Sequence, residues 1–152
     1  MDNTREITVS SDVESLEQVL VFVNSVLLNL NCEEHVINQI DIALDELFAN
    51  ISGYAYEGKT GEVTIRMEII HDPLSAVIEF RDGGMPFDPL KMPDPDVTLK
   101  AGERRIGGLG IFMVKSTMDD MSYEYKDGKN IVRIRKVLSV AEDIGDHSDD
   151  ES

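Results

Sequence analysis

Residues 62–81 read EVTIRMEIIHDPLSAVIEFR, and this stretch decides the fold class. Polar and apolar side chains alternate strictly over residues 62–69, which is the period of a strand that buries only one of its faces. The His-Asp-Pro break at residues 71–73 indicates a turn, which leads into a predicted partner strand over residues 75–81. The stretch therefore predicts a hairpin in an antiparallel part of a sheet.

Two helices are predicted on the N-terminal side of this hairpin. The first begins with a capping box formed by Ser11 and Glu14. Apolar residues then recur at spacings of three and four and predict one buried stripe: Val13, Leu16, Leu20, Val23, Leu27 and Leu30. The second helix is predicted to begin at Asn31, with Glu34 at the matching capping position, and to end near residues 53–58. Its buried face would include Val36, Ile40, Ala43, Leu47 and Ile51.

The chain on the C-terminal side of the hairpin continues with a long loop. Residues 82–107 are rich in Gly, Pro and Asp, and a loop of that length inside a compact domain is usually functional or mobile. A helix is predicted over 108–118. Two strands, 122–126 and 129–136, then flank an Asp-Gly pair, which is a strong hairpin signal.

A short first strand at residues 7–9 completes the order β-α-α-β-β-loop-α-β-β. This order predicts an α+β fold, a two-layer sandwich in which helices cover one face of a mostly antiparallel sheet. The chain of 152 residues has the length of one domain, which we expect to span residues 1–138. Residues 139–152 are expected to form an acidic, disordered tail.

The charge and composition exclude several classes of function. The net charge is −16, which argues against direct nucleic-acid binding because that binding depends on Lys and Arg. Cys32 is the only cysteine, so it is expected to be a buried side chain rather than part of a disulfide or zinc site. The longest aliphatic or aromatic run, residues 19–23, is too short for a membrane span, and the first residues do not resemble a signal peptide. A cytoplasmic protein is therefore expected.

The first segment with chemical potential is Asp-Glu-Leu-Phe-Ala-Asn at residues 45–50, on the second predicted helix. Glu46 and Asn50 are four residues apart, so their side chains project from the same face. The Asn50 oxygen is a suitable ligand for Mg²⁺, and Glu46 can accept a proton from an attacking hydroxyl. The alternative is an ordinary solvated polar face.

The second segment is Asp-Gly-Gly-Met-Pro-Phe-Asp at residues 82–88, directly after a strand. Asp82 can accept a hydrogen bond from an exocyclic amine such as N6 of adenine. Gly84 has no Cβ and would let the backbone approach a base closely. The alternative is an ordinary turn.

The third segment is Arg-Arg-Ile-Gly-Gly-Leu-Gly-Ile at residues 104–111, which leads into a helix. Glycines and a helix N-terminus together offer backbone N–H groups to an anion, so this segment can hold phosphates, with Arg104 or Arg105 near the terminal one. It lacks the Gly-Lys-Ser/Thr of a P-loop and does not follow a strand as a Rossmann fingerprint does. The alternative is a flexible loop.

These three segments, in this order, resemble the nucleotide-binding boxes of the GHKL (Bergerat-fold) ATPase/kinase superfamily. The pattern is similar to that of the bacterial anti-sigma-factor serine/threonine kinases. The motifs that carry this similarity are Glu46-x-x-x-Asn50 with Tyr54-Ala55-Tyr56, Pro86-Phe87-Asp88-Pro89, and Ile106 to Ile111 with Met118-Asp119. The resemblance covers about residues 7–136 and implies the histidine-kinase-like ATPase fold.

The resemblance also implies ATP or ADP and Mg²⁺ as cofactors. Asn50 would hold Mg²⁺ and Glu46 would be the catalytic base, while Asp82 would read adenine with Gly84 beneath the base. Residues 88–106 would form a lid over the nucleotide. The other implied nucleotide-binding residues are Pro86, Phe87, Lys100, Arg104, Arg105, Gly107, Gly108, Leu109, Gly110 and Ile111. Pro86 departs from the pattern because many superfamily members have a second glycine there.

The function implied by the resemblance is phosphorylation of a Ser or Thr on a STAS-domain anti-anti-sigma protein, with release or capture of a sigma factor. Homodimerisation is implied as well. The alternative is a non-catalytic binding module that sequesters a sigma factor or another regulator and responds to nucleotide. An ATP-driven dimer gate is disfavoured because transducer domains are missing. A stand-alone histidine kinase is disfavoured because no dimerisation helix with a phosphoacceptor histidine precedes the domain.

Overall fold

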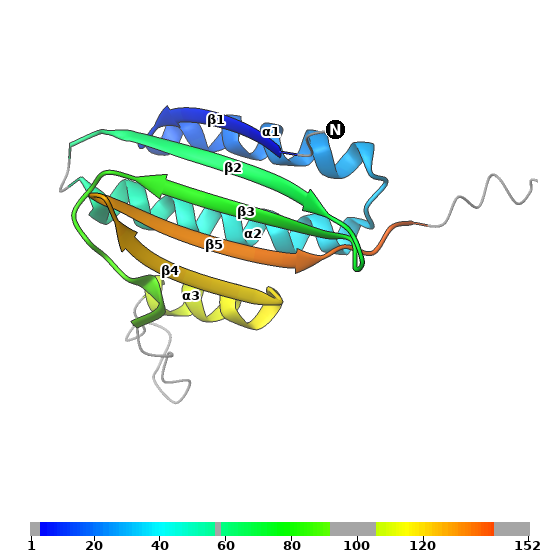
Figure 1. Cartoon of the computed structure of the whole chain (residues 1–152). Coiled ribbons are helices and arrows are strands. Elements are labelled where there is room, and N and C mark those ends of the chain that lie inside the picture. Colours follow the sequence, from blue (N-terminus) through cyan, green and yellow to red (C-terminus); the bar gives the residue numbers. More distant parts are fainter. Residues whose placement is uncertain (1–3, 57–58, 92–105, 142–152) are drawn as a thin grey trace, which may run out of the picture.

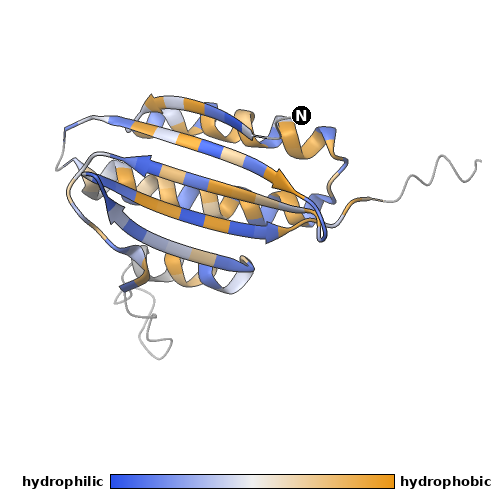
Figure 2. Ribbon diagram, in the orientation of Figure 1, coloured by the Kyte–Doolittle hydropathy of each residue, from blue (hydrophilic) through white to orange (hydrophobic). Residues whose placement is uncertain are grey.

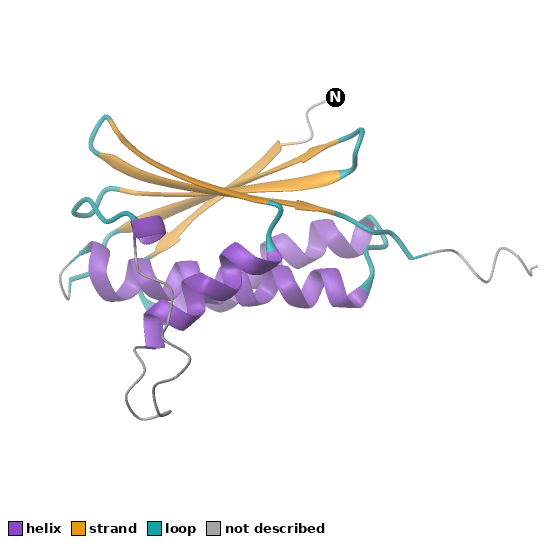
Figure 3. Ribbon diagram, turned by 90° about the horizontal axis from the view of Figure 1, so that it is seen from below, coloured by secondary structure: helices purple, strands orange, loops and turns teal. Residues whose placement is uncertain are grey.

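The computed structural model of the chain describes residues 4–56, 59–91 and 106–141 (Figure 1). Five antiparallel strands form one sheet in the order β1-β2-β3-β5-β4. The strands are β1 (Thr4–Ser10), β2 (Glu62–Ile70), β3 (Ser75–Asp82), β4 (Asp120–Lys126) and β5 (Lys129–Val137). The helices are α1 (Leu16–Asn29), α2 (Glu34–Asn50) and α3 (Ile106–Thr117). All three helices lie on one face of the sheet, so the two-layer α+β sandwich is confirmed (Figure 3).

The hairpin at residues 62–81 buries the face that the alternation of its side chains predicted. The four apolar residues that alternate along β2 are all buried: Val63, Ile65, Met67 and Ile69. Figure 2 shows the same alternation of hydrophobic and hydrophilic residues along the strands. The inner face of the sheet packs on α2, whose predicted stripe from Val36 to Ile51 is buried. The core therefore lies between α2 and the central strands.

The second predicted hairpin, β4–β5, is also confirmed. Asp127 and Gly128 both have positive φ, 53° and 76°, as a two-residue type I′ turn requires. Strand β4 begins at Asp120, two residues before the predicted start at Ser122. Helix α3 begins at Ile106 rather than near Gly108, so the glycines of the third segment lie in its first turns.

The start of the first helix differs from the prediction. Asp12 is the capping residue, because its Oδ1 accepts a hydrogen bond from the Glu14 N–H at 3.2 Å, ahead of a short 3₁₀ turn. Ser11 does not cap the helix. Its hydroxyl oxygen instead accepts a hydrogen bond from the Gly61 N–H at 3.0 Å and ties this connection to the approach to β2. The capping box was wrong because a long-range partner competes for the serine hydroxyl.

The buried stripe of α1 is also shifted. Val19, Val23 and Leu27 are fully buried, whereas Val13 is 64% exposed. Val19 was missed because the predicted stripe was started from Val13, which precedes the helix proper. Asn31 does not begin α2, since its φ of 60° places it in the left-handed region between the helices. Helix α2 begins at Glu34.

The chain beyond β5 pairs with the junction between α1 and α2. The Glu33 N–H donates to the Ser139 carbonyl at 2.9 Å, and the Ala141 N–H donates to the Asn31 carbonyl at 2.8 Å. Cys32 lies buried in this junction, and burial raises the pKa of its thiol. The expected start of the disordered tail at residue 139 is therefore wrong, because residues 139–141 are paired with the domain. Residues 142–152 lie outside the described residues, so disorder of the rest of the tail stays a prediction. Among the described helices, none has the length and apolar character needed to cross a bilayer.

Candidate functional site

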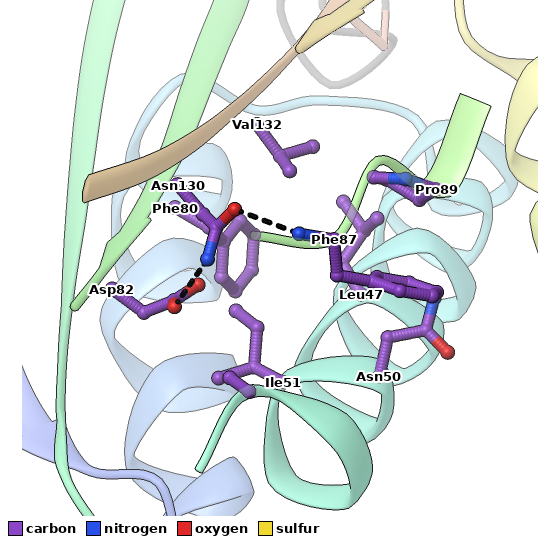
Figure 4. A pocket seen from close by; sticks show the side chains of 10 residues that line it. Leu47, Asn50, Ile51, Phe80, Asp82, Phe87, Pro89, Asn130 and Val132 are labelled. Carbon is purple, nitrogen blue, oxygen red and sulfur yellow. Dashed lines mark hydrogen bonds between the residues drawn. The ribbon is translucent and has the colours of Figure 1, made fainter. Parts of the chain in front are cut away.

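A pocket opens between the C-terminal end of α2, the end of β3 and the start of β5 (Figure 4). The space inside it that a water-sized molecule can occupy is about 20 Å³. Apolar side chains form most of its wall, and three polar side chains reach it from different elements. The lining residues are Leu47, Asn50, Ile51, Ala55, Phe80, Asp82, Phe87, Pro89, Asn130 and Val132. A mostly apolar cleft with a few convergent polar groups is typical of a small-molecule site.

Asp82 provides the carboxylate of this pocket. It is the last residue of β3 and is only 3% exposed. Its Oδ1 accepts hydrogen bonds from the Gly84 N–H at 2.9 Å and from Asn130 Nδ2 at 3.0 Å. Burial raises the pKa of Asp82, although these hydrogen bonds and the nearby charge of Lys129 act in the opposite direction. None of the described residues has a hydrogen bond to Oδ2, which leaves this oxygen available to a ligand that donates one.

Gly84 lies against the end of the second helix. Helix α2 continues into a π-helical turn, Ile51–Ala55, and the Met85 N–H donates to the Ala55 carbonyl at 2.7 Å. A Cβ atom on Gly84 would lie 2.1 Å from that carbonyl oxygen, so only glycine fits there. The close approach that Gly84 permits in this structure is therefore to the protein backbone.

Tyr56 holds the segment around Gly84 in place by contacts with the start of β2 and the end of β3. Its hydroxyl donates to the Glu62 carbonyl at 2.7 Å and accepts from the Gly83 N–H at 2.9 Å. The ring also occupies the space that a Cβ atom on Gly61 would need, at 2.2 Å from its Cζ. The π-helical turn, the start of β2 and the end of β3 are thus held together at the pocket.

Glu46 and Asn50 lie on one face of α2, as their spacing predicted. Glu46 is half-buried, and burial followed by the charge of Asp45 raises the pKa of its carboxyl group. Its carboxylate lies against α3, since a Cβ atom on Gly110 would be 1.9 Å from Glu46 Oε1. A carboxylate with a raised pKa is a stronger base than an ordinary glutamate.

Asn50 lines the pocket and is 6% exposed. Its Nδ2 is buried without a hydrogen-bond partner among the described residues. A buried donor without a partner is costly, so this amide fits a site that is completed by a ligand with a hydrogen-bond acceptor. Within the described ranges, no group of three acidic, His or Cys side chains forms a metal cage. An oxygen-liganded Mg²⁺ would therefore take one protein ligand from Asn50 and the rest from phosphates and water.

Helix α3 begins at Ile106, and its first residues include Gly107, Gly108 and Gly110. Helix α3 packs against α2, which brings Gly110 to Glu46. The free N–H groups at the start of a helix are suited to an anion. The predicted phosphate segment and the predicted base are thus neighbours in space, although 64 residues separate Glu46 from Gly110.

Other predicted site residues have different positions. Phe87 lines the pocket, but the neighbouring Pro86 is exposed and is not part of the wall. Ile111 is 1% exposed and belongs to the hydrophobic core. The backbone of Leu109 lies in the second turn of α3. Three predicted cationic residues lie outside the described residues, and they are Lys100, Arg104 and Arg105. Most of the predicted lid lies outside them as well.

Asn130 was missed by the sequence analysis, although it reaches Asp82 and lines the pocket. One signal was present. Asn130 shares its strand face with Val132 and Ile134, so it is a polar residue at an inward-facing position of β5. That signal becomes readable only when the register of the hairpin is known, because a shift of one residue reverses the face.

Comparisons with known proteins identify the family of the chain. Residues 9–136 match the model of the histidine kinase-like ATPase domain. Serine-protein kinase RsbW of Listeria monocytogenes is 31% identical over 106 residues, a match that covers 66% of this chain and 66% of that protein. The anti-sigma F factor of Caldanaerobacter subterraneus is 31% identical over 130 residues, which cover 84% of this chain and 87% of the relative.

Solved structures share the fold. The structure of the RsbU and RsbW domains of Rv1364c from Mycobacterium tuberculosis superposes with a TM-score of 0.63 at 14% identity, covering 91% of this chain and 33% of that one. The histidine kinase AdeS of Acinetobacter baumannii gives a TM-score of 0.50 at 17% identity, covering 89% of this chain and 69% of that one. The sequence matches and the shared fold lead to one assignment. The chain belongs to the histidine kinase-like ATPase family, the GHKL superfamily, and is similar to its bacterial anti-sigma-factor serine kinases.

Proposed function

We propose that this protein is an ATP-dependent serine/threonine protein kinase that acts as an anti-sigma, partner-switching regulator. The observation that carries the proposal is the contact between Glu46 on α2 and Gly110 on α3, next to the pocket that contains Asp82. This contact puts a basic carboxylate beside the helix end that suits phosphates. A pocket for the nucleobase, a site for the phosphates and a proton acceptor are then near one another.

In the proposed complex, the adenine ring occupies the pocket and its amino group donates to Asp82. The phosphates extend toward the N-terminus of α3, where Gly107 and Gly108 leave the backbone N–H groups accessible. Lys100, Arg104 and Arg105 are proposed to contribute charge from the lid. Mg²⁺, held by Asn50, would neutralise part of the phosphate charge when bound.

Glu46 is proposed as the catalytic base. It accepts the proton of the substrate hydroxyl as the hydroxyl oxygen bonds to the γ-phosphorus of ATP and the bond to the β-phosphate oxygen breaks, so that ADP leaves. The raised pKa of Glu46 suits this transfer, because a stronger base takes the proton more readily. Positioning and electrostatic stabilisation supply the rest of the rate.

The substrate is proposed to be a serine or threonine of a STAS-domain anti-anti-sigma protein, with a sigma factor as the competing partner. The names of two relatives, a serine-protein kinase and an anti-sigma F factor, support the kinase and sigma-factor parts of this proposal. The net charge of −16 suits protein partners better than nucleic acid. We also propose a cytoplasmic location and a homodimer.

Phosphate transfer tests the proposal. The chain is incubated with Mg²⁺, γ-labelled ATP and each STAS-domain protein encoded in the same genome. Glu46→Gln keeps the size of the side chain but removes the base, and we expect a rate loss of about 10²- to 10⁴-fold with ATP binding retained. Glu34→Gln is the matched control, because Glu34 is exposed at the other end of the same helix. A fully active Glu46→Gln variant would exclude this residue as the base.

The same experiment distinguishes the kinase from the alternative, a non-catalytic binding module. If ATP binds but no partner is labelled, the chain is instead a non-catalytic module that sequesters a regulator. In that case the affinity for the partner should change with nucleotide. If neither ATP nor ADP binds, the proposed use of the pocket is wrong.

A further inference from the structure

The side chain of Asn130 is the most heavily hydrogen-bonded group of the pocket. It lies directly opposite Asp82 in the register of β3 and β5 and is 4% exposed. Its Nδ2 donates to Asp82 Oδ1 at 3.0 Å and to the Met85 carbonyl at 2.8 Å, with the Gly84 carbonyl at 3.4 Å. Both N–H groups of the amide are therefore used by the carboxylate and by the segment that follows it.

The oxygen of the same amide is used as well. Oδ1 of Asn130 accepts a hydrogen bond from the Phe87 N–H at 3.1 Å and another from the Tyr123 hydroxyl. Figure 4 shows the amide between Asp82 and Phe87, bonded to each. All neighbours on one side are acceptors and all those on the other side are donors, so the orientation of the amide is fixed.

We infer that Asn130 is a positioning residue of the nucleotide site, which holds Asp82 by Oδ1 and leaves Oδ2 free for the amino group of the base. Asn130 has no donor or acceptor left for a ligand, so its effect on nucleotide passes through Asp82 and the 84–87 segment. Since Phe87 lines the pocket, the same amide also sets one wall of the base site. The inference rests on the proposed function, because it assigns a role within the same pocket.

Replacement of the Asn130 amide by a carboxylate should make nucleotide binding depend on pH. Asn130→Asp keeps the shape but removes both donors, and at neutral pH it places a second negative charge against Asp82. Protonation of that carboxyl group restores one donor toward Asp82. The defect of Asn130→Asp should therefore be relieved by acid, whereas that of Asn130→Ala, which restores no donor, should not.

Other titratable and charged groups face this cluster, and they are Tyr56, Tyr123, Asp88 and Lys129. Burial raises the pKa of both tyrosines above 10.0, so they stay protonated throughout the test. Wild type is measured at each pH, so that titration of the nucleotide phosphate is common to all proteins and cancels in the ratio of affinities.

The experiment measures ADP and GDP affinity by calorimetry at about pH 8 and pH 5.5, with the melting midpoint without nucleotide as a measure of folding. At pH 8 we expect ADP binding to weaken about 10- to 100-fold in both Asn130 variants. The preference for ADP over GDP should fall by a similar factor. At pH 5.5 Asn130→Asp should return to within a few-fold of wild type. Asn38→Asp on the exposed side of α2 is the matched charge control and should bind ADP normally.

A second variant separates stability from recognition. The exchange Asp82→Asn with Asn130→Asp restores one carboxylate and one amide in contact. We expect it to recover the melting midpoint relative to Asn130→Asp alone but not the full ADP affinity, since an uncharged amide oxygen then meets the base in place of a carboxylate oxygen. Wild-type affinity of Asn130→Asp at pH 8, or full recovery of ADP affinity in the exchange, would overturn the inference. No ADP binding by wild type would instead overturn the proposed function.

Discussion

The carboxylate of Glu46 on α2 lies against the backbone of Gly110 on α3, so closely that a Cβ atom on residue 110 would be 1.9 Å from Glu46 Oε1. The absence of a side chain at residue 110 thus lets the two helices meet at the proposed base. Any side chain there must displace the carboxylate or separate the helices. The position of Glu46 therefore depends on a residue in a different segment of the sequence.

Gly110→Ala tests this dependence. Alanine favours a helix by about 1 kcal/mol over glycine, so local helix stability should not fall. The methyl group should instead displace Glu46 and reduce phosphate transfer at least tenfold while ADP affinity changes little, because small displacements of a catalytic group are costly. Single-turnover transfer and ADP titration measure the two effects.

Gly53→Ala is the matched control, since the space around a Cβ atom at Gly53 is empty to 4 Å. It should leave phosphate transfer within about twofold of wild type. Equal activity of Gly110→Ala and wild type would show that Glu46 has room to move without cost, contrary to its assignment as a positioned base.

The pH dependence of phosphate transfer should report Glu46. Its pKa is raised above 4.5 by burial and by the charge of Asp45, and the base is active only when ionised. The rate should therefore fall as the pH falls through this raised pKa. Asp45→Asn removes the neighbouring negative charge, so the acid limb of the profile should move to lower pH. Exposed Glu34→Gln should leave the limb in place, and an unmoved limb in Asp45→Asn would assign the titration to another group.

Asp82→Asn should separate stability from ligand binding. The raised pKa of Asp82 means that the folded protein holds this proton more tightly than the unfolded chain, whose value is 3.8. Stability is therefore lost as the pH rises through the folded-state pKa, and the full penalty applies at neutral pH. Asparagine keeps an oxygen for the Gly84 and Asn130 donors but carries no charge. We expect the melting midpoint at pH 7 to rise by about 2–5 °C while ADP affinity falls at least tenfold.

The gain in stability should disappear below about pH 4, where wild-type Asp82 is protonated too. Thermal melts from pH 4 to pH 8 provide this comparison. A lower melting midpoint for Asp82→Asn at pH 7 would mean that the charge stabilises the fold, through Lys129 or the backbone donors, more than burial penalises it.

The sequence predicted the elements with a regular period well. The alternation along Val63 to Ile69 and the Asp-Gly turn at residues 127–128 correctly specified two hairpins, because both signals are local. The helix starts were less predictable. The hydroxyl of Ser11 has a distant partner, Gly61, and the pairing of residues 139–141 with the junction near Asn31 joins segments more than 100 residues apart.

The residues of the candidate site also fall into two groups, those that a local motif predicts and those that depend on long-range contacts. Glu46, Asn50 and Asp82 were found from short motifs and lie at or beside the pocket. Asn130 carries no motif, and its importance arises from register, which brings it opposite Asp82 across two strands. The contact of Glu46 with Gly110 likewise depends on how α3 packs on α2, which no local pattern specifies.

Glu79 anchors a charged cluster on the outer face of the sheet, opposite the helices. It is 7% exposed although it is a glutamate. Arg81 Nη2 donates to Oε2 at 2.7 Å and Arg133 Nη2 donates to Oε1 at 2.6 Å, so both carboxylate oxygens have a charged partner. Burial alone would raise the pKa of Glu79, but the two arginines outweigh it and hold the pKa below 4.5.

Glu79→Gln should therefore destabilise the fold without affecting ADP binding, because glutamine offers one acceptor and turns an amide toward the other arginine. We expect a loss of about 1–3 kcal/mol at pH 7. A lowered pKa gives stability that is complete above the unfolded value of 4.5 and is lost as the pH falls through the folded one. The difference between variant and wild type in urea unfolding should thus be constant from pH 5 to 8 and shrink near pH 3. Exposed Glu68→Gln on β2 should change stability by less than about 0.5 kcal/mol, and an equal loss there would mean that general surface charge, not the paired carboxylate, stabilises this face.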